Sequence, residues 1–139
     1  MSVEKNKANV RRHVDEVWNK GNLEVIPELI SPNYSTRAGD QEFRGPEGFK
    51  RFIAYSRSAI PDIHYTIDEM IGEGDTVAVR YTSTGTLKGE YFGIQPTGKK
   101  FKMTNAIFHR FEKGKQVGIQ GFTDNLALYQ QLGIPIPPG

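Results

Sequence analysis

The apolar residues of this chain change their spacing about halfway along it. Near the start they recur every three or four positions, as Val10, Val14 and Val17 do, which predicts an amphipathic helix from Val3 to about Lys20. The same spacing predicts two more helices, Leu23 to Ile30 and Gly45 to the residue before Pro61. The segment from Tyr34 to Phe43 has no clear period, and its structure stays open at this point.

Beyond residue 62, runs rich in Val, Ile, Thr, Tyr and Phe alternate with glycine-containing turns, which predicts strands joined by hairpins. The predicted strands are Ile63 to Ile71, Thr76 to Gly85, the surroundings of Tyr91 and Phe92, Phe101 to Phe111, and Gln116 to Phe122. Helices followed by consecutive strands indicate an α+β fold. We expect one curved antiparallel sheet with the N-terminal helices packed on its concave face, forming a cone-shaped α+β barrel. Its proline-rich end, Ile134 to Gly139, cannot be regular helix or central strand.

Composition narrows the function by exclusion. At 139 residues, the length predicts one domain spanning 1–139. With 18 basic and 16 acidic residues mixed along the chain, we expect no nucleic-acid partner. The absence of cysteine excludes disulfides and thiol catalysis, and three scattered histidines predict no metal site. With no signal-peptide pattern and no membrane-spanning apolar run, we expect a cytoplasmic protein with no membrane partner.

Asp124 is the strongest candidate for chemistry. It stands between a strand-like run ending at Phe122 and a short helix-like run from Leu126 to Leu132. A two-residue period places Gln116, Gly118, Gln120, Phe122 and Asp124 on one face, where a partly desolvated carboxylate could exchange protons near neutrality. The alternative is structural, because Asp before a helix is a favoured N-cap residue. The local pattern leaves both interpretations open.

A second polar row lies on the preceding strand. The two-residue period puts Asn105, Ile107 and His109 on one face, so His109 is a candidate to relay a proton to Asp124 or to donate to a carbonyl. The alternative is a half-buried histidine that its neighbours satisfy. We expect His13 and His64 to be solvated and Arg80 to pair with carboxylates on the solvent side.

Several motifs occur in the order and spacing of a known family. They are Phe43-Arg44-Gly45-Pro46-Glu47-Gly48, Ile60-Pro61-Asp62-Ile63-His64, Glu73-Gly74-Asp75-Thr76-Val77, Arg80 to Thr86, Gly89-Glu90-Tyr91-Phe92-Gly93-Ile94-Gln95-Pro96-Thr97-Gly98-Lys99, and Gly114 through Asp124 to Gly133. Together they resemble the SnoaL-like polyketide cyclases, within the group that shares the nuclear transport factor 2 and ketosteroid isomerase fold. Three positions, Ile107, Gly118 and Gln120, depart from the family's usual pattern.

The resemblance implies an internal pocket and a function. The implied activity is intramolecular aldol ring closure of a polyketide methyl ester, without metal or cofactor, and the family's catalytic aspartate falls on Asp124. The implied partners are an apolar or polyketide-like small molecule and a second copy of the chain, as a homodimer or higher homo-oligomer. Candidate substrate contacts are Asn105, Gln120, Phe122 and Trp18. Two alternatives remain, an isomerase or hydrolase using the same aspartate and a binding module without turnover.

Overall fold

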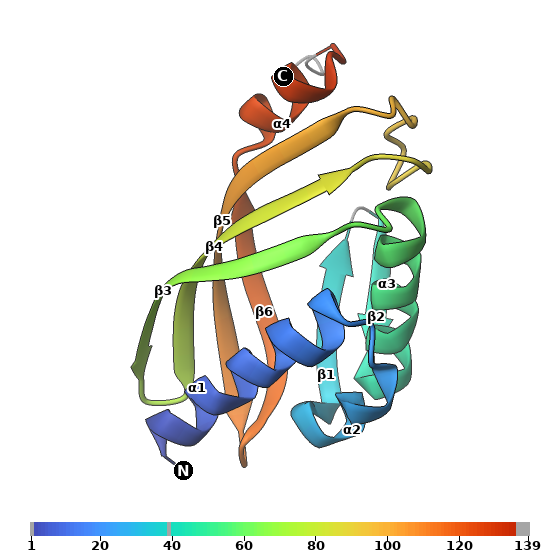
Figure 1. The fold of residues 1–139 in the computed structure, drawn as a ribbon. Coiled ribbons are helices and arrows are strands. Elements are labelled where there is room, and N and C mark those ends of the chain that lie inside the picture. Colours follow the sequence, from blue (N-terminus) through green and yellow to red (C-terminus); the bar gives the residue numbers. More distant parts are fainter. Residues whose placement is uncertain (1, 39, 136–139) are drawn as a thin grey trace.

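The computed structural model describes residues 2–38 and 40–135, and helices precede most of the strands along the chain (Figure 1). The helical elements are α1 (Val3–Arg12), a π-helix (His13–Asn19), a 3₁₀ turn (Leu23–Val25), α2 (Ile26–Leu29), α3 (Gly45–Ala59) and α4 (Asn125–Leu132). The strands are β1 (Ile30–Ala38), β2 (Gln41–Arg44), β3 (His64–Glu73), β4 (Thr76–Thr86), β5 (Lys100–Glu112) and β6 (Lys115–Thr123).

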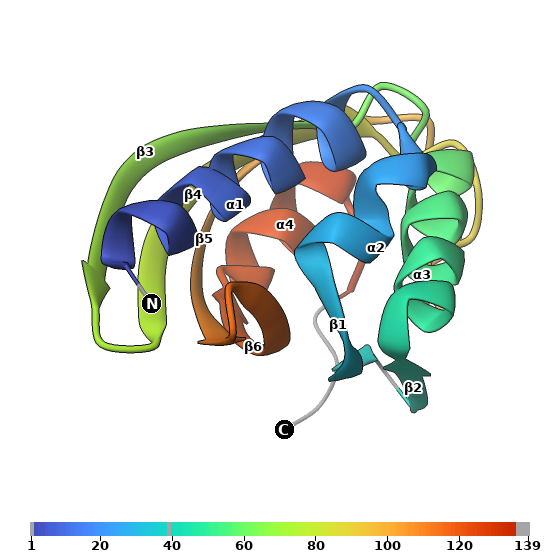
Figure 2. The same ribbon diagram turned by 90° about the horizontal axis from the view of Figure 1, so that it is seen from below.

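All six strands belong to one curved sheet in the order β2-β1-β6-β5-β4-β3. Seen from below, β3 bends around α1, while α3 lies beside β1 and β2 (Figure 2). The predicted α+β class with a curved sheet is confirmed. The sheet is mixed, because β1 runs parallel to β6 whereas the other neighbouring strands are antiparallel. It is also unclosed, because β2 and β3 are its two edge strands.

The segment without a clear period forms the β1–β2 hairpin, in which Ser35 pairs with Arg44 and Ala38 with Gln41. Pro32 interrupts the pairing of β1 with β6 because proline has no backbone N–H to donate. The predicted strand around Tyr91 and Phe92 is wrong. Only an isolated bridge joins Tyr91 to Ile94, within a loop that turns back on itself.

The first helix changes its winding partway along. It is an α-helix as far as Arg12 and a π-helix from His13 to Asn19, where the backbone bonds span five residues and not four. The predicted helix from Val3 to about Lys20 is confirmed, but the apolar period does not predict the π-helix within it. As a consequence, side chains that are five residues apart lie one above the other in this part of the helix.

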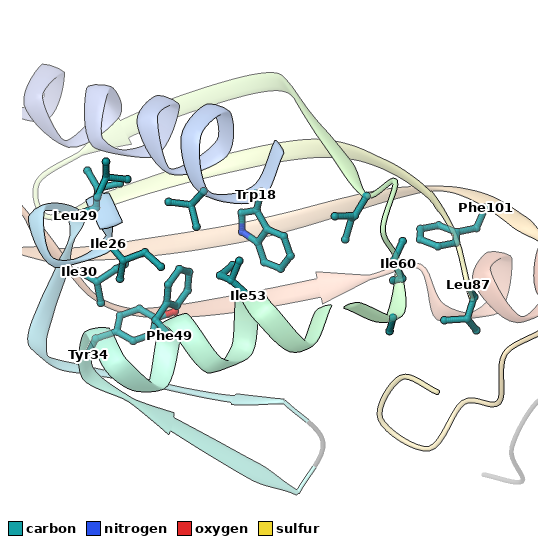
Figure 3. Close-up of a cluster of buried hydrophobic side chains, with 14 of the residues drawn as sticks. Trp18, Ile26, Leu29, Ile30, Tyr34, Phe49, Ile53, Ile60, Leu87 and Phe101 are labelled. Atoms are coloured by element: carbon teal, nitrogen blue, oxygen red, sulfur yellow. The ribbon is translucent and has the colours of Figure 1, made fainter. Parts of the chain in front are cut away.

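A large apolar cluster fills the space between the first helix and α3 (Figure 3). Ile26, Ile30 and Ile53 have no exposed surface, and Phe49 and Tyr34 are almost as deeply buried. A second cluster around Val10, Val77 and Phe111 lies between the first helix and the strands β4 and β5. Together the side chains of the two clusters cover the concave face of the sheet.

Two sequence predictions concern the proline-rich end of the chain and membrane-spanning helices. Of the proline-rich end, residues 136–139 lie outside the described residues, so the prediction for that segment is not addressed there. Among the described residues, no helix is long and apolar enough to cross a membrane.

A pair of leucines tests the location of the core. Leu29 is 3% exposed and Leu126 is 52% exposed. We expect Leu29→Ala to lower the free energy of unfolding by about 2–5 kcal/mol, because it removes buried methyl groups and leaves a cavity. Leu126→Ala should stay within about 0.5 kcal/mol of the parent chain. Urea unfolding followed by circular dichroism measures both, and equal losses would contradict this location of the core.

Candidate functional site

A cavity of about 90 Å³ lies between the helices and the concave face of the sheet. Most of its wall is aromatic or aliphatic, and its polar groups are two imidazoles, two phenols and one indole. The residues that line it are His13, Val14, Trp18, Phe49, Phe52, Tyr65, Tyr81, Ile107, His109 and Ile119. Such a cavity holds an apolar group and a small number of directed hydrogen bonds.

The π-helix brings His13 and Trp18 together, although they are five residues apart. The indole N–H of Trp18 donates to Nε2 of His13 at 3.0 Å, and both side chains are buried. The expectation that His13 is solvated is therefore wrong. His13 follows Val10 by three and precedes Val17 by four, which is the spacing of the buried stripe, so the pattern held a signal for its burial.

Gln116 joins the two histidines. Its Oε1 lies 3.0 Å from Nδ1 of His109, and its Nε2 lies 3.0 Å from Oδ1 of Asn9 and 3.4 Å from Nδ1 of His13. On the other side of His109, Nε2 lies 2.7 Å from the hydroxyl of Tyr81. A continuous buried chain of polar contacts therefore runs from Asn9 through Gln116 and His109 to Tyr81.

Burial keeps the groups of this chain neutral. Desolvation, with a smaller effect from His109, lowers the pKa of His13 from 6.5 to about 3. Desolvation also lowers the pKa of His109 to about 4, although its hydrogen bond to Gln116 acts in the opposite direction. Burial raises the pKa of the Tyr81 phenol well above its usual value. At neutral pH the interior therefore offers neutral hydrogen-bonding groups and no charge.

Asn105 forms a second polar group on the same face of β5. Its Oδ1 accepts from the Ser83 hydroxyl at 2.8 Å, and its Nδ2 donates to Oγ1 of Thr123 at 2.8 Å. Asn105 and His109 are both buried, as the two-residue period predicts, and Ile107 between them lines the cavity. Of the sequence-predicted residues, Asn105, His109 and Trp18 therefore face the interior.

The other predicted residues face away, because a one-residue bulge reverses the alternation of β6. Arg110 pairs with Gly118 and Phe111 with Gln116, so Val117 is the extra residue. Gln116 therefore points inward, whereas Gly118, Gln120 and Phe122 share the outer face with Phe108. The expectation that they share a face with Gln116 is wrong, and Phe122 is 58% exposed.

Asp124 lies at the junction of β6 and α4, exposed to solvent. Its Oδ1 accepts from the backbone N–H of Ala127 at 3.1 Å, so the N-cap interaction is formed. The expectation of a desolvated carboxyl at a cavity floor is wrong. Capping is thus one role of Asp124, and any proton transfer at this residue requires a ligand that reaches the surface.

A surface groove of about 520 Å³ lies where β1 and β6 separate after the pair Ser35–Gly118. Its lining residues are Ser35, Thr36, Arg37, Glu42, Ile119, Gln120, Gly121 and Thr123. Ile119 lines both the groove and the internal cavity. Thr123, which ends β6, directly precedes Asp124. The groove therefore shares one wall residue with the cavity and ends one residue before Asp124.

The remaining candidates lie at the surface as expected. His64 is exposed, and Arg80 lies 3.6 Å from a carboxylate oxygen of Asp68 and 3.6 Å from one of Glu69. Among residues 2–38 and 40–135, no three His, Asp or Glu side chains gather in a way that could hold a metal ion.

Comparisons with known proteins point to one family. The family model for SnoaL-like polyketide cyclases matches residues 8–132. Aklanonic acid methyl ester cyclase AcmA of Streptomyces galilaeus is 32% identical over 134 residues, covering 94% of this chain and 92% of that protein. The structure of TsrD from Streptomyces laurentii superimposes with a TM-score of 0.87 at 24% identity, over 97% of this chain and 99% of TsrD. A Catenulispora acidiphila protein described as having a ketosteroid isomerase-like fold has a TM-score of 0.77 at 19% identity, over 94% of this chain and 97% of that one.

The two buried imidazoles predict how stability depends on pH. Their pKa values are lower in the folded chain than the 6.5 of an exposed imidazole, so the unfolded chain binds more protons below that pH. Their contribution is present above pH 6.5 and is lost as the pH falls toward 4. We expect the free energy of unfolding to drop by roughly 4 kcal/mol between pH 7 and pH 5.

Urea titrations at pH 7, 6 and 5 measure this slope. His13→Leu should reduce the pH dependence by about half, because each imidazole contributes similarly. The control His64→Gln changes an exposed imidazole and should leave the slope as it is. A parent chain whose stability is constant over this range would show that the imidazoles are accessible to protons in the folded state.

Proposed function

Because the chain belongs to the SnoaL-like polyketide cyclase family, we propose that it closes a ring in a polyketide-type ester by an intramolecular aldol reaction. The observation that carries this proposal is the similarity to aklanonic acid methyl ester cyclases over nearly the whole chain. The departures at Ile107, Gly118 and Gln120 bear on which ester is used, since Ile107 lines the cavity and Gln120 the groove.

The reaction needs one group that takes and returns a proton. We propose Asp124 for this role, in line with the family resemblance. Its carboxylate takes a proton from the carbon beside a carbonyl, the resulting enolate carbon bonds to a ketone carbon, and the ketone oxygen receives a proton. The proton removed is replaced in the product, so the mass does not change. Holding the two carbons within bonding distance contributes several kcal/mol to such a reaction.

The groove supports this role for Asp124. Ligand pockets typically measure about 300–1,000 Å³, and the groove falls in that range while the cavity alone does not. We therefore propose that the substrate lies in the groove with one end in the cavity against Trp18. Arg37 lines the groove from β1, and we propose that its charge stabilises a developing oxyanion there.

His109 has a different role in this proposal from the one expected. Both of its ring nitrogens are already engaged, by Gln116 and by Tyr81, so it has no free lone pair for a substrate proton. We propose that it positions Tyr81 and does not transfer the proton itself. Asn105, bonded to Thr123 beside Asp124, similarly fixes the end of β6.

A second candidate function is ligand binding without turnover. The exposure of Asp124 and the small volume of the cavity favour it, because a solvated carboxylate caps α4 without any chemistry. An isomerase or hydrolase using Asp124 is the third possibility. These candidates differ in what loss of the Asp124 charge does to turnover. A cytoplasmic location stays a prediction.

Asp124→Asn distinguishes them, because Asn caps a helix about as well as Asp. With aklanonic acid methyl ester as the substrate, liquid chromatography with mass spectrometry should show a product of unchanged mass and altered retention. We expect Asp124→Asn to lower kcat by about 100-fold or more while the melting temperature stays close to that of the parent chain.

The matched control is Asp15→Asn, which removes an exposed carboxylate from the first helix and should leave the rate unchanged. Turnover at the parental rate in Asp124→Asn would eliminate the proposed role. Binding of the ester without any product would favour the binding module, and a product of different mass would favour hydrolysis.

A homodimer through the outer face of the sheet is also proposed. Ile71, Phe108 and Phe122 on this face are 61%, 39% and 58% exposed. Strand pairing puts Ile71, Ala78 and Phe108 in one row across the sheet and Ala106 and Phe122 in the next. An apolar patch of this kind is typical of a surface that is covered by a partner.

Light scattering coupled to size exclusion tests this proposal. At micromolar concentration we expect the mass of two chains for the parent and of one chain for Phe108→Glu combined with Phe122→Glu, because two buried carboxylates oppose association. Leu126→Glu introduces one such carboxylate at an exposed apolar residue on α4 and should leave the dimer intact. A parent chain that elutes as a monomer would contradict the proposal.

A further inference from the structure

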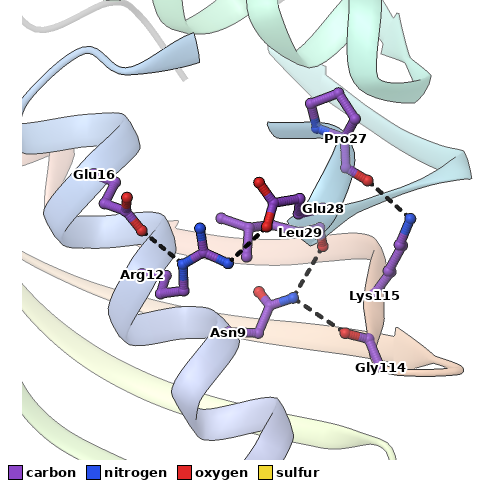
Figure 4. A network of polar contacts seen from close by, with 8 residues as sticks. All are labelled: Asn9, Arg12, Glu16, Pro27, Glu28, Leu29, Gly114 and Lys115. Carbon is purple, nitrogen blue, oxygen red and sulfur yellow. Dashed lines mark hydrogen bonds and ion pairs between the residues drawn. The ribbon is translucent and has the colours of Figure 1, made fainter. Parts of the chain in front are cut away.

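The direction of every hydrogen bond in the buried chain can be deduced, starting from two backbone carbonyls. Nδ2 of Asn9 lies 3.0 Å from the carbonyl oxygen of Leu29 and 3.2 Å from that of Gly114 (Figure 4). Carbonyl oxygens only accept, so the NH₂ group of Asn9 must face both of them. The remaining atom of this amide, Oδ1, therefore faces Gln116 as an acceptor.

The orientation of Gln116 follows from that of Asn9. Its NH₂ group must face Oδ1 of Asn9, which leaves Oε1 toward His109. An amide oxygen only accepts, so Nδ1 of His109 carries the hydrogen. The buried imidazole is neutral and has a single N–H, which leaves Nε2 with a lone pair. The hydroxyl of Tyr81, 2.7 Å away, must donate to it.

This deduction determines what Tyr81 can offer to a ligand. Its only hydrogen is directed at His109, so its oxygen has lone pairs and no hydrogen left for the cavity that both residues line. The other imidazole adds no acceptor, because Nε2 of His13 already accepts from Trp18. The end of the cavity formed by Tyr81 and His109 is therefore an acceptor.

We infer that the internal cavity selects a ligand end that carries a hydrogen-bond donor, such as an enol or phenol O–H, with the Tyr81 oxygen as its acceptor. Gln116 and His109 determine this preference without touching the ligand, so they are positioning residues. A carbonyl end is disfavoured at Tyr81, because it would put two acceptors face to face with no proton between them.

The size of the cavity limits what enters it. At about 90 Å³ it is smaller than the roughly 150 Å³ cavity known to bind benzene. A small ring or the terminal part of a larger molecule fits, with the rest of the molecule in the groove past Ile119. The inference concerns binding alone and does not depend on ring closure.

Pyrrole and furan test it as a matched pair of five-membered rings. Pyrrole has an N–H donor and no free lone pair on nitrogen, whereas furan has no donor. Trp18 is the only tryptophan and lines the cavity, so its indole N–H resonance reports occupancy as a single NMR signal. We expect pyrrole to bind roughly five-fold more tightly than furan, the equivalent of one neutral hydrogen bond.

Furan binding as tightly as pyrrole, or more tightly, would overturn the inference, since a cavity without an acceptor favours the less hydrated ring. So would the absence of any shift of the Trp18 signal up to the solubility limit of both rings. Because neither probe reacts, a chain that turns over no ester can still pass this test, and an active cyclase can fail it.

His109→Phe tests the origin of the preference. The variant removes the acceptor of the Tyr81 hydroxyl, which can then turn its hydrogen toward the cavity, so the five-fold preference should fall to near parity. Arg110→Gln changes the neighbouring residue on the outer face of β5 and should leave the preference unchanged. A His109→Phe variant that folds and keeps the full preference would contradict the assigned role of His109.

A measurement on the parent chain keeps the inference testable if His109→Phe does not fold. Long-range proton–nitrogen NMR spectra show which ring nitrogen of a histidine carries the hydrogen. We expect Nδ1 for His109. Finding the hydrogen on Nε2 would mean that Tyr81 accepts and that its own O–H points into the cavity, which reverses the inferred preference.

Discussion

The amide pair Asn9–Gln116 is the interaction on which the interior of this protein depends. It joins α1 to β6 across more than a hundred residues of sequence, and both side chains are buried. Breaking a buried pair of this kind leaves donors and acceptors without partners, at about 1–3 kcal/mol for each group. Because Asn9 also donates to the carbonyls of Leu29 and Gly114, the pair ties α1, the end of α2 and the β5–β6 turn to one another.

This tie explains why two histidines can be buried without a carboxylate beside them. Each imidazole has neutral partners at hydrogen-bond distance, namely Trp18 for His13, and Gln116 and Tyr81 for His109. One contact is frustrated. With Nε2 of His13 accepting from Trp18, its Nδ1 carries the hydrogen and faces the NH₂ group of Gln116 at 3.4 Å, so two donors meet. The neutral state is retained because charging either ring would cost more.

Sequence reasoning succeeded where a local period decides the structure. The alternation along β5 correctly placed Asn105 and His109 inside, because that strand pairs with β4 without a break. It failed on β6, where the extra residue Val117 exchanges the two faces. A bulge has no sequence signature strong enough to be read from one chain, so Gln120 and Phe122 were assigned to the wrong face. The burial of His13 was not predicted, because the charged residues Arg11, Arg12, Asp15 and Glu16 around it suggested a solvated helix face.

The separation of charge from the cavity follows from the same constraint. A carboxylate beside Tyr81 and His109 would meet hydrogens that are already committed, and neither could donate to it without breaking the chain that Asn9 begins. Its desolvation would then go uncompensated. The fold instead keeps Asp124 at the surface, stabilised by the first turn of α4, and gives the interior only neutral groups of fixed direction. Under the proposed function, a ligand that lies in the groove with one end in the cavity meets both a charged group and a dry recognition site.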